Sequence, residues 1–114
     1  MDPQGLSREH TFQENLTDEG EIAREVERIA REVAGDVAKE GRLAARIAVK
    51  VRFAPFVTKT RSVTLAEPTA EAAAIAEGAR RALERFELDR AVRLLGVRAE
   101  LAPPSDRPPE PPPW

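Results

Sequence analysis

The residues that offer chemistry most clearly are cations gathered in one part of the chain. Between positions 42 and 65 there is no aspartate or glutamate. Lysine and arginine side chains neutralise phosphates and release the counterions condensed on nucleic acids. Serine and threonine hydroxyls in the same segment donate hydrogen bonds that position a phosphate without reading a base. A phosphate-bearing partner is therefore the first expectation. The cations of this segment are Arg42, Arg46, Lys50, Arg52, Lys59 and Arg61.

Other reactive groups are sparse. The chain has no cysteine, which excludes a disulfide framework and a thiolate metal site. Its one histidine, His10, is predicted to be partly buried on the inner side of a strand, since no second histidine accompanies it as a metal ligand. The carboxylates between positions 18 and 40 are spread among arginines, as is typical of a solvated helix face. We therefore expect no catalytic residue, metal site or cofactor, and the chain alone is not predicted to be an enzyme.

Length and charge limit the architecture. The chain has 114 residues, of which 41% are hydrophobic, enough for one small domain. The net charge of −2 argues at first against a nucleic-acid partner, but the acidic and basic segments are separate and predict one acidic and one basic layer. No stretch resembles a signal peptide or a membrane span, so a cytoplasmic protein without a membrane partner is expected. The predicted domains are a tether remnant at 1–5, a folded domain at 6–101 and a proline-rich disordered tail at 102–114.

Two helices are predicted from the spacing of apolar residues. Such residues recur every three or four positions over 18–40, which indicates one helix with a single apolar stripe. Thr17 is its expected N-cap and Gly41 its expected stop. The second helix is predicted over 68–86, is rich in alanine and has Thr69 as its cap.

Four strands are predicted from alternation of apolar and polar residues. With the helices they give the order β-α-β-β-α-β, an α+β fold in which two helices cover one face of a four-stranded sheet. The other face is left open and is rich in cations and small hydroxyl residues, which suits phosphates. By pattern alone, an ordinary solvated sheet face explains these residues equally well. The residues expected on the open face are Ser7, Thr11, Arg46, Lys50, Arg52, Gly96 and Arg98.

The third strand leaves two interpretations open. Val63 and Leu65 need the core, and strict alternation then places Lys59 and Arg61 on the core side as well. Either a bulge after Pro55–Phe56 resets the alternation, or these long side chains emerge past the edge of the core. In both cases Thr58, Thr60 and Ser62 form the outward row.

Three motifs occur in order along the chain: SREHTF at 7–12, RFAPFVTKTRSVTL at 52–65 and RLLGVR at 93–98. Together they resemble the little finger, or polymerase-associated domain, of Y-family translesion DNA polymerases of the DNA polymerase IV type. The resemblance covers about 5–101, nearly the whole folded domain. It implies a β-α-β-β-α-β fold with an antiparallel sheet whose exposed face lies in the DNA major groove. The domain would grip template and primer backbones, independently of sequence, in DNA damage bypass.

The resemblance also implies partners and contact residues. The parent protein would be a DNA-directed DNA polymerase that uses Mg²⁺ in its palm, and this domain would lie beside the palm and thumb. The domain itself would need no cofactor. Lys50 is added to the contact residues by its place on the open face, and Arg93 is the weakest candidate of the set. The expected DNA-binding residues are Ser7, Arg8, Glu9, Thr11, Lys50, Thr60, Arg61, Ser62, Arg93 and Arg98.

The C-terminal segment leaves a second function open. Bacterial relatives often end in a peptide, containing glutamine and rich in leucine or phenylalanine, that docks on the sliding clamp. This chain ends in LAPPSDRPPEPPPW instead, so a sliding clamp is a doubtful partner of this chain. The tail is predicted to be a polyproline II extension that acts as a spacer or docks on an aromatic groove. The alternative function is therefore a protein-interaction module that uses the acidic helix face or this tail.

Overall fold

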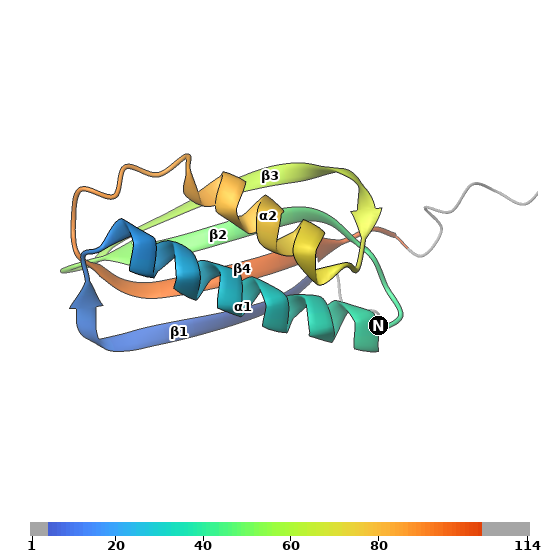
Figure 1. Ribbon diagram of the computed structural model, residues 1–114, viewed down its shortest axis with the longest axis horizontal. Helices are drawn as coiled ribbons and strands as arrows, with labels where there is room; N and C mark the ends of the chain where they lie inside the picture. The colour runs from blue at the N-terminus through green and yellow to red at the C-terminus, as the bar shows by residue number, and fades with distance from the viewer. Residues whose placement is uncertain (1–4, 104–114) are drawn as a thin grey trace, which may run out of the picture.

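The computed structural model describes residues 5–103. They form four strands and two helices in the order β-α-β-β-α-β (Figure 1). The predicted tether remnant, apart from Gly5, and most of the predicted proline-rich tail lie outside the described residues. The elements are β1 (Gly5–Leu16), α1 (Glu19–Lys39), β2 (Ala44–Phe53), β3 (Val57–Thr69), α2 (Ala72–Leu83) and β4 (Val92–Leu101).

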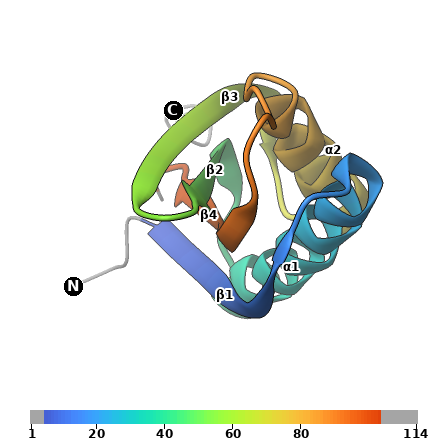
Figure 2. The ribbon, with the colours of Figure 1, turned by 90° about the vertical axis from the view of Figure 1, so that its left-hand side faces the viewer.

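The strands form one antiparallel sheet in the order β1-β4-β2-β3. Strands β4 and β2 lie at the centre, and β1 and β3 form the two edges. Figure 2 shows both helices on the same side of the curved sheet. Within the described part of the chain, no helix covers the other side. The predicted α+β fold, its element order and its open sheet face are confirmed.

Helix α1 lies where the apolar spacing predicts it, but its cap differs. The N-cap is Asp18, and the prediction of Thr17 was wrong. Oδ1 of Asp18 accepts a hydrogen bond from the backbone N–H of Gly20 at 2.9 Å. Aspartate and threonine are both good N-caps, so two adjacent candidates could not be separated by residue type alone. At the other end Gly41 has a φ of 64°, a left-handed conformation that glycine adopts without strain, and it ends the helix as predicted.

Helix α2 begins later than predicted. Strand β3 continues through Pro68 to Thr69, and the helix starts only at Ala72, so both the predicted start and the cap at Thr69 were wrong. Proline is tolerated at this position because β3 is an edge strand. The hydroxyl of Thr69 instead accepts a hydrogen bond from the backbone N–H of Glu71 at 3.0 Å, in the turn that separates strand from helix. Phe86 lies past the end of the helix but is still buried.

The pairing of β2 with β3 decides between the two interpretations of the third strand. It is regular from Phe53 opposite Val57 to the pair of Arg46 and Thr64, so no bulge follows Pro55. The irregularity lies at the other end of β2, between positions 44 and 46. Lys59 and Arg61 therefore lie on the helix side of the sheet, and because β3 is an edge strand both side chains remain exposed.

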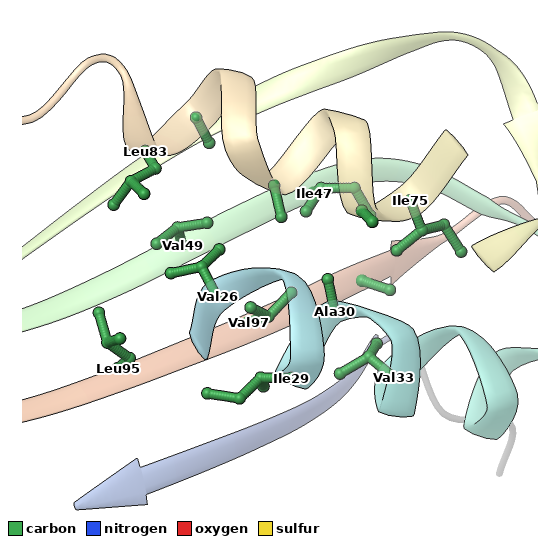
Figure 3. Close-up of a cluster of buried hydrophobic side chains, with 14 of the residues drawn as sticks. Val26, Ile29, Ala30, Val33, Ile47, Val49, Ile75, Leu83, Leu95 and Val97 are labelled. Carbon is green, nitrogen blue, oxygen red and sulfur yellow. The ribbon is translucent and has the colours of Figure 1, made fainter. Parts of the chain in front are cut away.

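The core is a layer of aliphatic side chains between the helices and the two central strands. Figure 3 shows side chains of α1 and α2 directed toward those of β2 and β4. These residues are almost completely excluded from water, and such burial is the main favourable contribution to folding. The helices are thereby held on one side of the sheet, and the polar residues of the strands face away from them. Central core residues are Val26, Ile29, Val33, Ile47, Val49, Leu95 and Val97.

Candidate nucleic-acid interface

The side of the sheet away from the helices is called the open face here. Strand pairing aligns its residues in rows that cross all four strands, because paired residues on neighbouring strands point to the same side. Each row therefore combines side chains that are far apart in the sequence. The rows, in the order β1, β4, β2 and β3, are Gly5, Glu100, Arg46 and Thr64; Ser7, Arg98, Ala48 and Ser62; Glu9, Gly96, Lys50 and Thr60; and Thr11, Leu94, Arg52 and Thr58.

Two cations of the open face have an acidic neighbour. Nζ of Lys50 donates a hydrogen bond to Oε2 of Glu9 at 2.5 Å, within an ion pair. Nη2 of Arg46 donates to the hydroxyl of Ser62 at 2.7 Å. The guanidinium of Arg46 is also 3.9 Å from a carboxylate oxygen of Glu100, a looser pair. All of these side chains are partly or fully accessible, so water and salt screen their charges.

The other two cations of the open face have no acidic partner there. Nε of Arg52 donates a hydrogen bond to the hydroxyl of Thr58 at 3.1 Å. Arg98 makes no side-chain hydrogen bond or ion pair within residues 5–103, and its neighbours across the sheet are the small residues Ser7 and Ala48. Arg98 is thus the cation of this face that can take an anionic ligand with no internal partner to displace.

A shallow hollow lies in the middle of the open face. Its floor is formed by Ala48 and Gly96, whose small size leaves space between the longer side chains around them. Both a lysine and an arginine reach its rim, together with two hydroxyl groups and one carboxylate. This combination can accept a phosphate and donate several hydrogen bonds to it. The lining residues are Ser7, Glu9, Ala48, Lys50, Thr60, Gly96, Val97 and Arg98.

Most of the predicted DNA-binding residues come together on the open face, although whether they bind DNA stays a prediction. Arg46 and Arg52 also lie there but were not included in the predicted binding set. Alternation along β2 was sufficient to place them on this side, so the signal that could have found them was present in the sequence. The predicted residues on the open face are Ser7, Glu9, Thr11, Lys50, Thr60, Ser62 and Arg98.

Arg8 and Arg61 lie on the other side of the sheet, so the structure does not bring them to the open face. Arg8 makes two hydrogen bonds to the carboxylate of Asp36 in α1, at 2.7 and 3.0 Å. The hydrogen bond from Arg8, aided by its charge, lowers the pKa of the Asp36 carboxyl below its usual value. The guanidinium of Arg61 lies over the ring of Phe86, 5.5 Å from its centroid. Both arginines therefore have contacts that tie an edge strand to the helix layer.

Two further predicted residues have unexpected surroundings. His10 was predicted to be partly buried, and this was wrong: it is exposed on the edge strand β1, with its ring centroid 4.8 Å from that of Phe12 in an edge-to-face contact. Arg93 is also exposed, at a bulge in β4. The pairing of β4 with β2 shifts between Arg52 and Phe53, which leaves Arg93 without a paired residue.

On the surface of α1, arginine side chains form ion pairs with neighbouring glutamates. Arg28 pairs with Glu25 at 2.9 Å, and Arg31 approaches Glu27 at 3.4 Å. Pairs of this kind on an exposed helix contribute little stability but partly neutralise the acidic surface. Within residues 5–103, no cluster of acidic or histidine side chains could hold a metal ion, and neither helix is long and apolar enough to cross a membrane.

Comparison with known sequences agrees with this architecture. The model of the impB/mucB/samB family C-terminal domain matches residues 3–108. The chain is similar to DNA polymerase IV 2 of Mycobacterium tuberculosis, with 41% identity over 100 residues, which are 88% of this chain and 29% of the relative. It is also similar to DNA polymerase IV of Akkermansia muciniphila, with 36% identity over 90 residues, which are 78% of this chain and 25% of the relative. The chain thus spans less than a third of the length of these relatives.

Comparison with solved structures agrees as well. The little finger domain of PolIV, in a complex with the beta-clamp processivity factor, has a TM-score of 0.70 and 25% identity, and the match covers 96% of this chain and 99% of that one. A Y-family DNA polymerase chimera of Dbh and Dpo4 has the same fold, with a TM-score of 0.68 at 18% identity over 88% of this chain and 29% of that one. The sheet with one open face, the family match and these similarities lead to one conclusion: the chain belongs to the impB/mucB/samB C-terminal domain family and is a non-catalytic little finger domain of the Y-family DNA polymerase IV type.

Proposed function

We propose that the open face of the sheet holds primer–template DNA by its phosphate backbones, independently of sequence. The observation that supports this most directly is the set of four cations on a sheet face that no described helix covers. Hydroxyl groups of β1 and β3 lie beside these cations and can donate hydrogen bonds to phosphates. No feature of the face requires a particular base, which suits a domain that moves along any template.

The proposal extends to the longer protein to which such a domain belongs. We infer that this protein is a DNA-directed DNA polymerase acting in translesion synthesis, because the relatives are DNA polymerases IV and the solved chimera is a Y-family polymerase. Its palm would hold Mg²⁺ for phosphoryl transfer, and palm and thumb would be the neighbours of this domain. Its place would be the cytoplasm. The domain would contribute grip on the DNA, and no step of the chemistry.

The structure refines which residues we expect to contact DNA. Arg98 leads the set, because it has no internal partner within the described chain. Arg46 and Arg52 join it, since they lie on the same face. Arg8 and Arg61 lie on the helix side of the sheet, so they would contact DNA only by reaching around the edge of the sheet. Arg93 keeps its place as the weakest candidate.

A charge-reversal pair tests this function. Arg52→Glu with Arg98→Glu changes the open face, while Arg24→Glu with Arg31→Glu makes the same charge change on α1. Binding of a fluorescent primer–template duplex is measured for both variants and the parent chain at several salt concentrations. We expect the open-face variant to bind more weakly by on the order of tenfold or more. Its salt slope should become shallower by about 1.8, because two fewer phosphates are neutralised.

The control variant should bind nearly as the parent chain does, with circular dichroism showing that both variants are folded. Equal weakening in the two variants would show that net charge alone attracts the DNA. Absence of salt-dependent binding by the parent chain at low salt would contradict the proposed function.

A second candidate is supported by the solved complex of a PolIV little finger with the beta clamp. We propose that a clamp contact of this chain would use the folded residues 5–103, because the little finger domain in that complex has the same fold and the match covers 96% of this chain. Analytical ultracentrifugation with a bacterial beta clamp, using the full chain and the chain shortened to residue 103, tests this. Equal binding supports the proposal, and binding that requires the tail contradicts it. The acidic helix face is a weaker protein-binding surface, because Arg28 and Arg31 already pair with its carboxylates.

A further inference from the structure

Glu9 and Lys50 meet on the open face although they lie on strands that do not pair with each other. Strand β4 separates them, and the residue between them in the row is Gly96. Because Gly96 has no side chain, the chain of Glu9 can lie across it: a Cβ at position 96 would be only 3.0 Å from Cγ of Glu9. The carboxylate then reaches Nζ of Lys50 at 2.5 Å. The backbone thus brings an acid directly to a cation of the proposed DNA-binding face.

The other cations of this face are held differently. Arg46 and Arg52 donate to neutral hydroxyl groups, and the acidic neighbour of Arg46 is 3.9 Å away. Arg98 lies in a row with small uncharged residues. Lys50 is therefore the cation of the open face that is most tightly engaged by a carboxylate, and it lies at the rim of the central hollow.

We propose that Glu9 competes with a DNA phosphate for Lys50 and so weakens the grip of the open face. This inference rests on the proposed function of that face. A phosphate in the hollow could pair with Arg98 without displacing an acidic partner, but could gain Lys50 only by displacing the carboxylate of Glu9. After that displacement the carboxylate stays beside the phosphate and repels it. The domain therefore binds with one cation fewer than its sequence offers, which favours easy release and movement along the DNA.

The energetic scale of the Glu9–Lys50 pair suits such competition. The side chains of Lys50 and Glu9 are 39% and 44% exposed, so solvent and salt weaken the pair. A phosphate carries more acceptor oxygens than one carboxylate and can bridge Lys50, Thr60 and Arg98 around the hollow. The pair is therefore strong enough to occupy Lys50 in the free domain and weak enough to be exchanged.

The test combines Glu9→Gln with Lys50→Met in a double-mutant cycle of DNA binding. Glutamine keeps the size of Glu9 and removes its charge. We expect Glu9→Gln to tighten duplex binding about fivefold at low salt, the upper range for an exposed ion pair. The salt slope should become steeper by about 0.9, for one further phosphate neutralised by the released Lys50. In the Lys50→Met background the gain should be smaller and the slope should not steepen.

A matched control separates this mechanism from general repulsion. Glu67→Gln removes the same charge from an exposed strand residue of β3 that lies beside α2, away from the open face. The competitor role is supported if Glu67→Gln leaves the affinity and the slope nearly unchanged. If Glu9→Gln gives the same gain with and without Lys50, or does not steepen the slope, the competitor role is overturned while the DNA-binding function stands. If neither the parent chain nor Glu9→Gln shows salt-dependent binding, the proposed function fails as well.

Discussion

At the scale of single residues, two arginines show how one position along a strand changes a role. Arg8 follows Ser7 and Arg61 follows Thr60, yet each points to the helix side while its neighbour points to the open face. Side chains alternate along a strand, so a shift of one residue moves a cation to the opposite side of the sheet. Arg8 is therefore used to join β1 to α1 through Asp36, and Arg61 packs on Phe86.

The Arg8–Asp36 pair predicts how stability depends on pH. The folded state holds the pKa of Asp36 below its usual value, so the pair contributes stability above the usual carboxyl pKa. This contribution is lost as the pH falls through the lower pKa of the folded state. Asp36→Asn should therefore lower the urea midpoint at neutral pH, and its difference from the parent chain should vanish in acid.

Urea unfolding of both proteins between about pH 7 and about pH 2 measures this difference. Asp89→Asn, an exposed substitution in the segment between α2 and β4, is the control and should show little difference at any pH. A deficit of Asp36→Asn that persists unchanged in acid would contradict the role assigned to the pair.

At the scale of the elements, small residues let helix α2 pack closely on the sheet. Helix α2 buries small residues against β2 and β3, which lets its backbone come close to the sheet. A Cβ at Gly78 would lie 2.8 Å from Cδ2 of Leu65 and 3.3 Å from Cγ1 of Ile47. Gly35 in α1 is exposed, and a Cβ there would meet nothing within 4 Å. Gly78 is thus buried against the sheet, where a side chain does not fit without moving its neighbours, whereas Gly35 has space around it on the exposed side of α1.

Alanine substitutions at these two glycines should separate helix propensity from packing. Gly35→Ala should stabilise the domain by up to about 1 kcal/mol, because alanine is the better helix former and the site has space. Gly78→Ala gains the same propensity but forces Leu65 and Ile47 to move, so its net effect should be smaller or destabilising. Urea denaturation of the two variants gives the comparison. Equal stabilisation by both would show that α2 can move away from the sheet at no cost.

At the scale of the whole molecule, the distribution of charge matters more than its sum. The chain carries a net charge of −2, yet many of its carboxylates lie on the helix layer, while the open face has four cations and two carboxylates, Glu9 and Glu100. The field near the open face is set by these nearby charges, among which cations are in excess, because salt screens charges more than about 10 Å away at moderate ionic strength. An acidic protein can therefore still present a surface that binds phosphates.

The salt dependence of DNA binding measures how many of these cations take part. With Lys50 engaged by Glu9, the cations of the open face that donate no hydrogen bond to a carboxylate are Arg46, Arg52 and Arg98. Each neutralised phosphate contributes about −0.9 to the slope of log K against log salt, so three phosphates predict a slope of about −2.7 and four a slope of about −3.6. Fluorescence anisotropy across a salt series determines the slope. A slope of about −3.6 would show that Lys50 already binds a phosphate in the parent chain.

Sequence alone determined the features that depend on local periodicity. The apolar spacing of α1, the alternation in β2 and β4 and the stop at Gly41 are properties of neighbouring residues, and each was predicted correctly. The motifs shared with Y-family little fingers pointed to the family that the comparisons show. The start of α2 was not predicted correctly, because proline is found both at the start of a helix and in an edge strand.

Only the tertiary structure decided which distant residues meet. The strand order β1-β4-β2-β3 places Glu9 and Lys50 in one row, 41 positions apart in the sequence, with only Gly96 between them. It also makes β1 and β3 the edges, where His10, Lys59 and Arg61 stay exposed on the helix side. Periodicity specifies the face of a strand but neither its neighbours nor its place in the sheet. These follow from burying the apolar sides of all six elements in one core, which is a property of the whole chain.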